Sequence, residues 1–296
     1  MAHATPARTE DRPLAGIAWM VATGLLFVAV TATVKWIGDA VPPAQGAFLR
    51  YALGLPLLIP MWPVFRRGLP AVGRTEWRLF AGRGLAHTLA VILWFYAMTR
   101  IPIAEVTAMG YLTPVLTALG AVLLLGERMT RVRVLAVAGA LLGAALILRP
   151  GARALDPGHM AMLGTSLGFA ASYLILKRVS GHHPAVVVVM LSLFVTAFLA
   201  PFAALDWVTP TAFQLAQLFL VAVFATAGHY TMTLAFACAP VTVVQPAVFL
   251  QLIWAAALGA LAFGEAIDPW VILGGVVIVS AASLVALAEG RRAAKA

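Results

Sequence analysis

The chain has 296 residues, of which 62% are hydrophobic and only 10% are charged, with a formal net charge of +9. A soluble domain is nearer a quarter charged, and a chain this apolar cannot cover itself with polar surface, so a water-soluble protein is excluded. We predict an all-α integral membrane protein, because helices satisfy their own backbone hydrogen bonds in lipid and the apolar runs lack β-barrel alternation.

Ten apolar runs are long enough to cross a bilayer as helices, which takes about 20 residues each. The first could be confused with a secretory signal, but it is too long and no small-residue cleavage site follows it, so it is kept as a true span. The single cysteine, Cys238, excludes an internal disulfide. In chain order the runs cover roughly residues 14–34, 45–65, 79–99, 104–125, 131–148, 159–176, 184–204, 212–234, 241–263 and 269–288.

Basic residues are distributed unevenly between the two sides of the expected membrane. With the N-terminus placed inside, fourteen Lys and Arg fall on inside segments, and four fall on outside links. This bias follows the positive-inside rule and predicts the inner (plasma) membrane, with the tails 1–13 and 289–296 both cytoplasmic. The positive charge thus faces the lipid bilayer, and no nucleic-acid partner is expected. The four outside residues are Lys35, Arg100, Arg149 and Arg153.

Two stretches about 138 residues apart read alike, and both end in Gly-Glu: "YLTPVLTALGAVLLLGE" (111–127) and "FLQLIWAAALGALAFGE" (249–265). "FVAVTATVK" (27–35) likewise matches "FAASYLILK" (169–177). The chain is therefore expected to contain two repeats of five spans, over 14–150 and 151–288. Because five is odd, the second repeat enters the membrane inverted, which suits alternating access around a central site. Chance similarity of apolar helices, or a duplicated scaffold that transports nothing, is the alternative.

The sequence resembles the drug/metabolite transporter superfamily, and within it the ten-helix EamA-like branch, over essentially the whole chain. The resemblance is carried by "FLRYALGLPLLIP" (48–60), "WFYAMTRIPIAEVTAMGYLTPVLTALGAVLLLGE" (94–127), "GALLGAALILRPG" (139–151), and "GHYTMTLAFACAPVTVVQP" followed by the second Gly-Glu helix (228–265). It implies a carrier of small organic metabolites, similar to family members that export amino acids or import riboflavin or S-adenosylmethionine.

Carboxylates are absent from the middle of every expected span, since all eleven fall in tails, links or helix ends. Small four-helix multidrug relatives in the superfamily use a buried glutamate, so a proton-driven exporter of lipophilic cations is disfavoured. Glu127 and Glu265 are expected to be structural, because they precede the fifth and tenth spans and carboxylates are favourable near helix N-termini. Asp268 and Pro269 are suited to the N-cap and first position of the tenth helix. Catalysis or ion binding by the two glutamates is the alternative.

Ionisable residues inside a membrane are functional candidates by default. His87 lies near the middle of the third span and is either a substrate or proton site or a neutral core histidine. His229 lies in the eighth span and leaves the same choice. Arg50 and Arg83 lie inside the second and third spans, where they either reach the interface or pair with a helix, or instead attract an anionic group.

Further cavity candidates are aromatic and amide side chains within the spans, although Tyr and Trp also form interfacial belts. Pro114 and Pro246 are candidate hinges, with static kinks as the alternative. Gly139 and Gly143 form a GxxxG pattern that favours close packing within or between chains, so a homodimer stays open. The remaining cavity candidates are Trp94, Tyr111, Tyr173, Tyr230, Gln245, Gln251 and Trp254.

Motifs of nucleotide-driven pumps and metalloenzymes are missing, since the chain has no Walker sequence, no HExxH and no paired Cys/His spacing. We therefore expect no cofactor, no metal and no catalytic residue. The sequence predicts a secondary-active carrier of a small organic metabolite, with uptake and export as rival directions. An intramembrane enzyme or a membrane scaffold is the alternative from another class.

Overall fold

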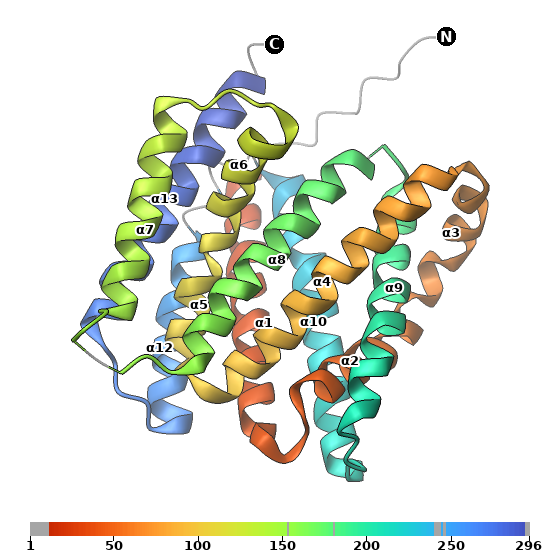
Figure 1. The fold of residues 1–296 in the computed structure, drawn as a ribbon, viewed down its shortest axis with the longest axis horizontal. Helices are drawn as coiled ribbons and strands as arrows, with labels where there is room; N and C mark the ends of the chain where they lie inside the picture. The colour runs from red at the N-terminus through yellow and green to blue at the C-terminus, as the bar shows by residue number, and fades with distance from the viewer. Residues whose placement is uncertain (1–11, 153, 180, 240–243, 245–246, 294–296) are drawn as a thin grey trace.

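The computed structural model describes residues 12–293 except 153, 180, 240–243 and 245–246. This part of the chain is a bundle of long apolar helices (Figure 1). The helices are α1 (Pro13–Ile37), α2 (Pro43–Gly54), η2 (Leu55–Met61), α3 (Trp62–Gly68), α4 (Arg74–Arg100), α5 (Ile103–Gly110), α6 (Leu112–Leu125), α7 (Arg131–Leu148), α8 (Pro157–Val179), α9 (Pro184–Leu205), α10 (Ala212–Cys238), α12 (Val248–Phe263) and α13 (Pro269–Ala293).

The expected membrane spans are present. Nine helical segments of the described chain are long and apolar enough to cross a membrane, and the helix of the ninth expected span is shorter within that part. The prediction of an all-α membrane protein is confirmed. Glycine ends both Gly-Glu helices in the left-handed conformation, with φ of 69° at Gly126 and 64° at Gly264, which an L side chain rarely adopts.

Two of the expected spans are interrupted, the second where the sequence predicted one continuous helix and the fourth close to the candidate hinge Pro114. The second span changes from α2 to the 3-10 segment η2 and then to α3. Pro56 and Pro60 lie in η2 and lack the N–H that an α-helix needs, so proline chemistry explains the change. The fourth span breaks between α5 and α6 at Tyr111, three residues before Pro114. The ring of Pro114 would clash with the carbonyl of Gly110, four residues earlier, in a continuous helix.

The helix pairs of the two repeats correspond. α1 packs along α10 and α8 packs along α4, while α2 packs on α9 and α7 on α13. Exchanging the repeats turns α1 into α8 and α10 into α4, so each of these pairs maps onto another pair or onto itself. Figure 1 shows α4 beside α8 across the middle, and α7 beside α13. This is the arrangement that a two-fold relation between five-helix repeats requires.

The repeats run in opposite directions. Lys35, near the end of α1, pairs with Glu265 and lies at one end of the bundle, which also holds the α7–α8 link (Figure 1). Lys177, at the corresponding position of α8, pairs with Glu127 in the α6–α7 link at the opposite end. The start of α1 and the end of α13 share this second end.

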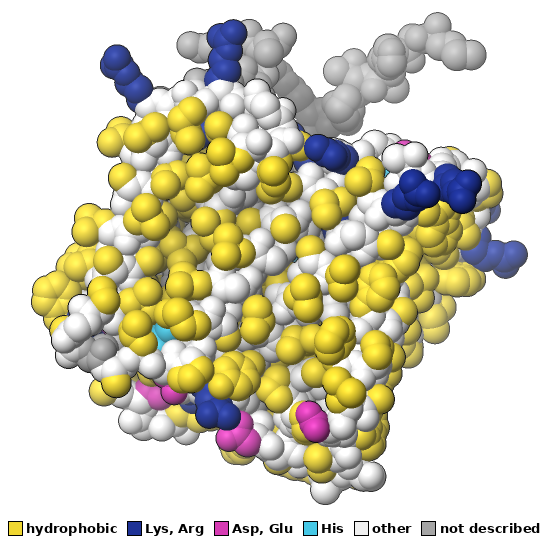
Figure 2. All heavy atoms as spheres, in the orientation of Figure 1, with side chains coloured by type: hydrophobic (Ala, Val, Ile, Leu, Met, Phe, Trp, Pro, Cys, Tyr) yellow, Lys and Arg dark blue, Asp and Glu magenta, His cyan; other side chains and the backbone are white. Residues whose placement is uncertain are grey.

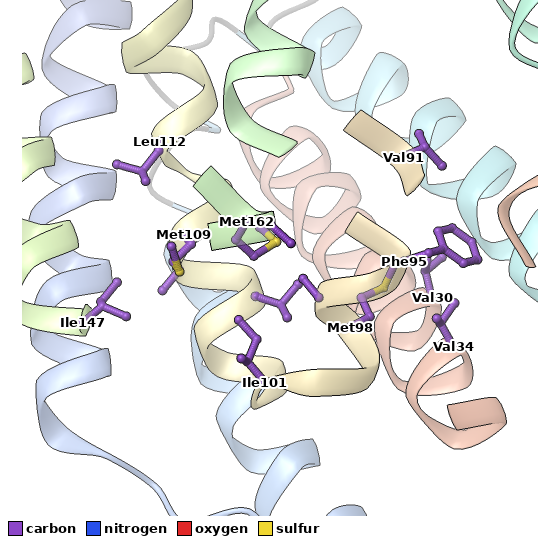
Figure 3. Close-up of a cluster of buried hydrophobic side chains, with 14 of the residues drawn as sticks. Val30, Val34, Val91, Phe95, Met98, Ile101, Met109, Leu112, Ile147 and Met162 are labelled. Carbon is purple, nitrogen blue, oxygen red and sulfur yellow. The ribbon is translucent and has the colours of Figure 1, made fainter. Parts of the chain in front are cut away.

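The largest buried cluster joins helices of both repeats (Figure 3). Met98 of α4 and Met109 of α5 lie at its centre with Met162 of α8, between Ile147 of α7 on one side and Val30 of α1 on the other. Burying such side chains stabilises the fold by roughly 1.5–3 kcal/mol each in water, although lipid weakens that contribution.

The outer surface of the bundle is largely apolar. Leu124, Leu135, Leu141 and Leu261 each expose more than three-fifths of their surface. Figure 2 shows hydrophobic side chains across the face, with most Lys and Arg along the edge that holds the α6–α7 link. Lipid is the solvent that such a surface fits.

The GxxxG pattern of α7 is used within the chain. A Cβ at Gly143 would lie 2.5 Å from Ile278 Cγ1 and 2.6 Å from the Gly274 carbonyl oxygen of α13. A Cβ at Gly139 would approach Ala281 to 3.3 Å. The pattern therefore explains the close packing of the last helices of the two repeats and gives no support to a dimer.

Candidate functional site

His87 lies at the midpoint of α4 and is held by side chains from both repeats. Its Nε2 is 2.9 Å from the Tyr51 hydroxyl on α2, and its Nδ1 is 3.3 Å from the Ser172 hydroxyl on α8. A neutral imidazole has one donor and one acceptor nitrogen, so the two hydroxyls satisfy both. These bonds link three helices at the middle of the bundle.

A group of aromatic rings packs beside His87. The Phe169 ring of α8 lies 4.8 Å from the His87 ring. Phe169 also contacts the Trp94 ring at 6.1 Å and stacks with the Tyr173 ring at 6.5 Å. Tyr173 still exposes 42% of its surface. Three sequence candidates, His87, Trp94 and Tyr173, therefore share one aromatic group with a polar centre, which is the composition of a small-molecule site.

Two arginines belong to the same region. The Arg50 guanidinium lies 4.1 Å from the centroid of the Tyr51 ring, in cation–π geometry. Arg83 lies one helical turn before His87 and is only 5% exposed. Its Nη1 donates to the Val187 carbonyl of α9 at 3.1 Å. Arg83 therefore pairs with a neighbouring helix, which is one of the two arrangements that the sequence left open beside anion binding.

His229 packs between α10 and α1. Its Nδ1 donates to the Ala225 carbonyl at 2.7 Å, and its ring meets the Phe27 ring edge-on at 5.2 Å. We define the central cluster as Arg50, Tyr51, Arg83, His87, Phe169, Ser172 and Tyr173, with Trp94 at its edge.

Other sequence candidates lie apart from the central cluster. The Tyr111 hydroxyl donates to the Val248 carbonyl at 3.0 Å, which ties the α5–α6 break to the start of α12. Gln251 packs against Gly24 of α1, where a Cβ would lie 3.2 Å from the Gln251 Cβ. Tyr230 is 64% exposed and Trp254 38% exposed, and no described contact joins either to the cluster. Gln245 and Pro246 lie outside the described residues.

The Gly-Glu glutamates form repeat-related ion pairs at opposite ends of the bundle. Glu265 lies 2.8 Å from Lys35 Nζ and accepts from the Ile103 backbone N–H at 2.9 Å. It therefore sits at the N-terminus of α5, in the other repeat, and not at that of the helix that follows it. The Lys35 ammonium also donates to the Ile101 carbonyl at 2.8 Å.

Glu127 makes the corresponding contacts at the other end. It accepts hydrogen bonds from Lys177 and from Arg133, the latter at 2.5 Å. These bonds hold the pKa of the Glu127 carboxyl below its ordinary value. The N-cap of α7 is Thr130, and that of α13 is Asp268, which accepts from the Trp270 N–H at 2.9 Å.

Sequence reasoning missed several side chains of the site. Tyr51, Phe169 and Ser172 were not singled out, because an aromatic or hydroxyl residue in an apolar run has no distinguishing spacing. A buried pair was also missed: His159 Nε2 lies 2.5 Å from the Glu105 carboxylate, and both side chains are 4% exposed. The signal available was a histidine near the start of the sixth span and an acid near the start of the fourth.

Two inverted five-helix repeats around a polar and aromatic centre define a membrane transporter of small solutes. The model of the EamA-like transporter family matches residues 14–149 and again 156–287. The chain belongs to the EamA-like transporter family.

Relatives of known activity match over nearly the full length. A riboflavin transporter of Rhizobium johnstonii is 31% identical over 96% of this chain and 95% of its own. The pseudopaline exporter CntI of Pseudomonas aeruginosa is 27% identical over 90% and 94%, and an S-adenosylmethionine uptake transporter of Rickettsia bellii is 24% identical over 95% and 96%. A crystal structure superposes with a TM-score of 0.60 at 21% identity, over 96% of this chain and 99% of that one, which is a likeness of fold. This chain is thus a small-metabolite transporter of the drug/metabolite superfamily.

Proposed function

We propose that this protein is a secondary-active carrier of the inner membrane that exposes the central cluster alternately to the two sides. It has no enzymatic role, and both termini are cytoplasmic. The observation that carries the proposal is the linkage of His87 to Tyr51 of its own repeat and to Ser172 of the other. A site built across the repeat boundary changes when one repeat rocks against the other.

The repeat-related ion pairs support alternating access. Lys35–Glu265 closes one end of the bundle, and Lys177–Glu127 bridges the other. Exchange of the two repeats exchanges the two pairs, so breaking one while keeping the other gives the two states that alternating access needs. In this structure both pairs are formed.

The charge distribution supports the orientation. Basic side chains gather at the end that holds the start of α1 and the end of α13 (Figures 1 and 2). By the positive-inside rule this end faces the cytoplasm. The Lys35–Glu265 pair then lies at the outer end and the Lys177–Glu127 pair at the inner end.

The test is transport by purified protein in liposomes. Counterflow of labelled riboflavin, S-adenosylmethionine and amino acids is compared for wild type, Tyr51→Phe and Tyr96→Phe. Both changes remove one hydroxyl, but only the Tyr51 hydroxyl bonds His87. Losing one such bond weakens binding by roughly 0.5–1.5 kcal/mol, or about 2- to 13-fold.

We expect Tyr51→Phe to raise the half-saturating concentration of the transported solute, and Tyr96→Phe to leave it unchanged. Equal effects of the two changes, or wild-type behaviour of Tyr51→Phe, would place the site elsewhere. Net accumulation from outside, measured against release of preloaded solute, gives the direction of transport. Protein that moves no solute in any arrangement would contradict the proposal.

A further inference from the structure

The central cluster carries positive charge without a carboxylate partner. Arg50 and Arg83 both lie inside spans, and neither forms an ion pair with an acid in the described part of the chain. The acids described there lie in links or near helix ends, where Glu105, Glu127, Glu265 and Asp268 are all paired with basic partners. The centre of the transporter is therefore electropositive.

The hydrogen-bonding groups of Arg83 are only partly paired, although the residue is just 5% exposed. Its Nη1 has the Val187 carbonyl, but its Nε is buried with no hydrogen-bond partner. An unpaired polar atom of a buried cation is unfavourable, and a single neutral carbonyl does not compensate the charge. A fold that keeps this group buried favours an anion as the missing partner.

The neighbours of Arg83 point to the same ligand. The Arg50 guanidinium lies over the ring of Tyr51, whose hydroxyl bonds His87. Arg83 lies one helical turn before His87, so both arginines neighbour the same histidine. A guanidinium presents its N–H groups in a planar fork that fits the oxygens of a carboxylate or phosphate. A cationic solute would meet two like charges there.

The aromatic side chains define the other part of the ligand. Phe169 stacks with Tyr173 and meets His87 and Trp94 edge-on or tilted, so ring faces and edges lie beside the basic groups. Such surfaces favour a flat conjugated ring over a flexible aliphatic chain.

We propose that the transported substrate is a small organic anion, with its carboxylate or phosphate between Arg50 and Arg83 and a planar ring against Phe169 and Tyr173. This rests on the proposed function and names the substrate class of the same site. The anionic group supplies the acceptor that Arg83 Nε lacks. The ring of the substrate covers the exposed aromatic surface of Tyr173.

The test compares ligands that differ only in the anionic group. Purified protein is titrated with riboflavin and flavin mononucleotide, which share a ring but differ by a phosphate. A smaller pair, indole-3-acetamide and indole-3-acetate, shares a ring and differs in whether the side group is a neutral amide or a carboxylate. Binding is followed by flavin fluorescence and by thermal shift for the indoles.

Charge-assisted bonds predict that the anionic member of at least one pair binds about 10- to 100-fold tighter. Arg83→Gln and Arg50→Gln should reduce the affinity for the anion to that for its uncharged partner and leave the uncharged partner's affinity unchanged. Arg100→Gln is the matched control, because Arg100 also lies over a tyrosine ring, that of Tyr96 at 5.0 Å, but at the end of α4. Arg50, which is only half-buried, provides the variant that keeps the fold if Arg83→Gln does not.

Three results would overturn the inference. The first is equal affinity for the charged and uncharged members of both pairs. The second is unchanged anion binding in both Arg50→Gln and a folded Arg83→Gln. The third is thermal protection by inorganic phosphate alone that equals that of the ring-bearing anions, which would leave the ring without a role. Transport of a neutral or cationic solute by wild type and both arginine variants alike would refute the anion class while the carrier function stands. Failure of all transport would instead count against the proposed function.

Discussion

Replacing the two repeat-related lysines should have unequal effects on stability. Lys35 and Glu265 are 17% and 12% exposed, and Lys35→Met leaves the mostly buried carboxylate with the Ile103 N–H as its remaining described partner. Lys177 is 60% exposed, so Lys177→Met removes a largely solvated charge. The same chemical change is thus made at equivalent positions in two environments.

The expected magnitudes follow from burial. Removing one partner of a buried ion pair costs about 3–5 kcal/mol, whereas an exposed pair contributes about 0–1 kcal/mol. The Lys35–Glu265 pair is mostly but not fully buried, so we expect Lys35→Met to lower the free energy of unfolding by about 2–3 kcal/mol. Lys177→Met should lower it by about 1 kcal/mol or less.

The assay is reversible unfolding of the detergent-solubilised protein by sodium dodecyl sulfate, followed by far-UV circular dichroism. A double-mutant cycle of Lys35→Met with Glu265→Gln separates the pair from other effects and should give a coupling above about 1 kcal/mol. The reasoning is refuted if the two lysine changes destabilise equally, or if the cycle shows no coupling.

Three other changes test the packing and the ionisable groups. Gly143→Leu should lower the free energy of unfolding by at least about 1–3 kcal/mol in the same assay, because the new side chain would overlap Ile278 and the α13 backbone. Gly110→Ala should not, because the space around its Cβ is open. Similar losses in the two variants would contradict this packing. The pKa of Glu127 is lower in the folded protein than its ordinary value of 4.5, so its ionised carboxylate stabilises the fold fully above pH 4.5. This stabilisation is lost as the pH falls through the folded pKa, so Glu127→Gln should reduce the acid-induced fall in melting temperature. An unchanged profile of melting temperature against pH would contradict this role of Glu127. Glu105→Gln keeps an acceptor for His159 and should still drive uphill transport in liposomes, whereas loss of uphill transport alone would make Glu105 a coupling group.

The sequence was sufficient to predict the class, the repeats and the ionisable residues of the centre. Apolar run length identifies spans because lipid imposes one length on every helix, and the matched Gly-Glu endings reveal the repeat. His87 and Arg83 stand out because a charged or titratable side chain is rare at that depth.

Contacts between helices could not be read from the same signals. The pairing of Glu265 with the start of α5 joins residues 162 positions apart, so the local pattern suggested the helix that follows Glu265 instead. The hydroxyl partners of His87 come from two other helices, and nothing in an apolar run indicates which helix it faces. The proline-rich second span was predictable in principle, because Pro56 and Pro60 within one run disfavour a continuous α-helix.

The most direct test of alternating access measures both ends of the bundle in one preparation. With Cys238 replaced by Ala, spin labels on Asp39 and Ile267 report the outer end, and labels on Met129 and Arg178 report the inner end in a second variant. Distance distributions are recorded by double electron–electron resonance in liposomes, with and without a transported solute. We predict two populations at each end that shift in opposite directions, with the outer distance short when the inner one is long. Distances that stay fixed, or that lengthen at both ends together, would contradict a carrier built from two rocking repeats.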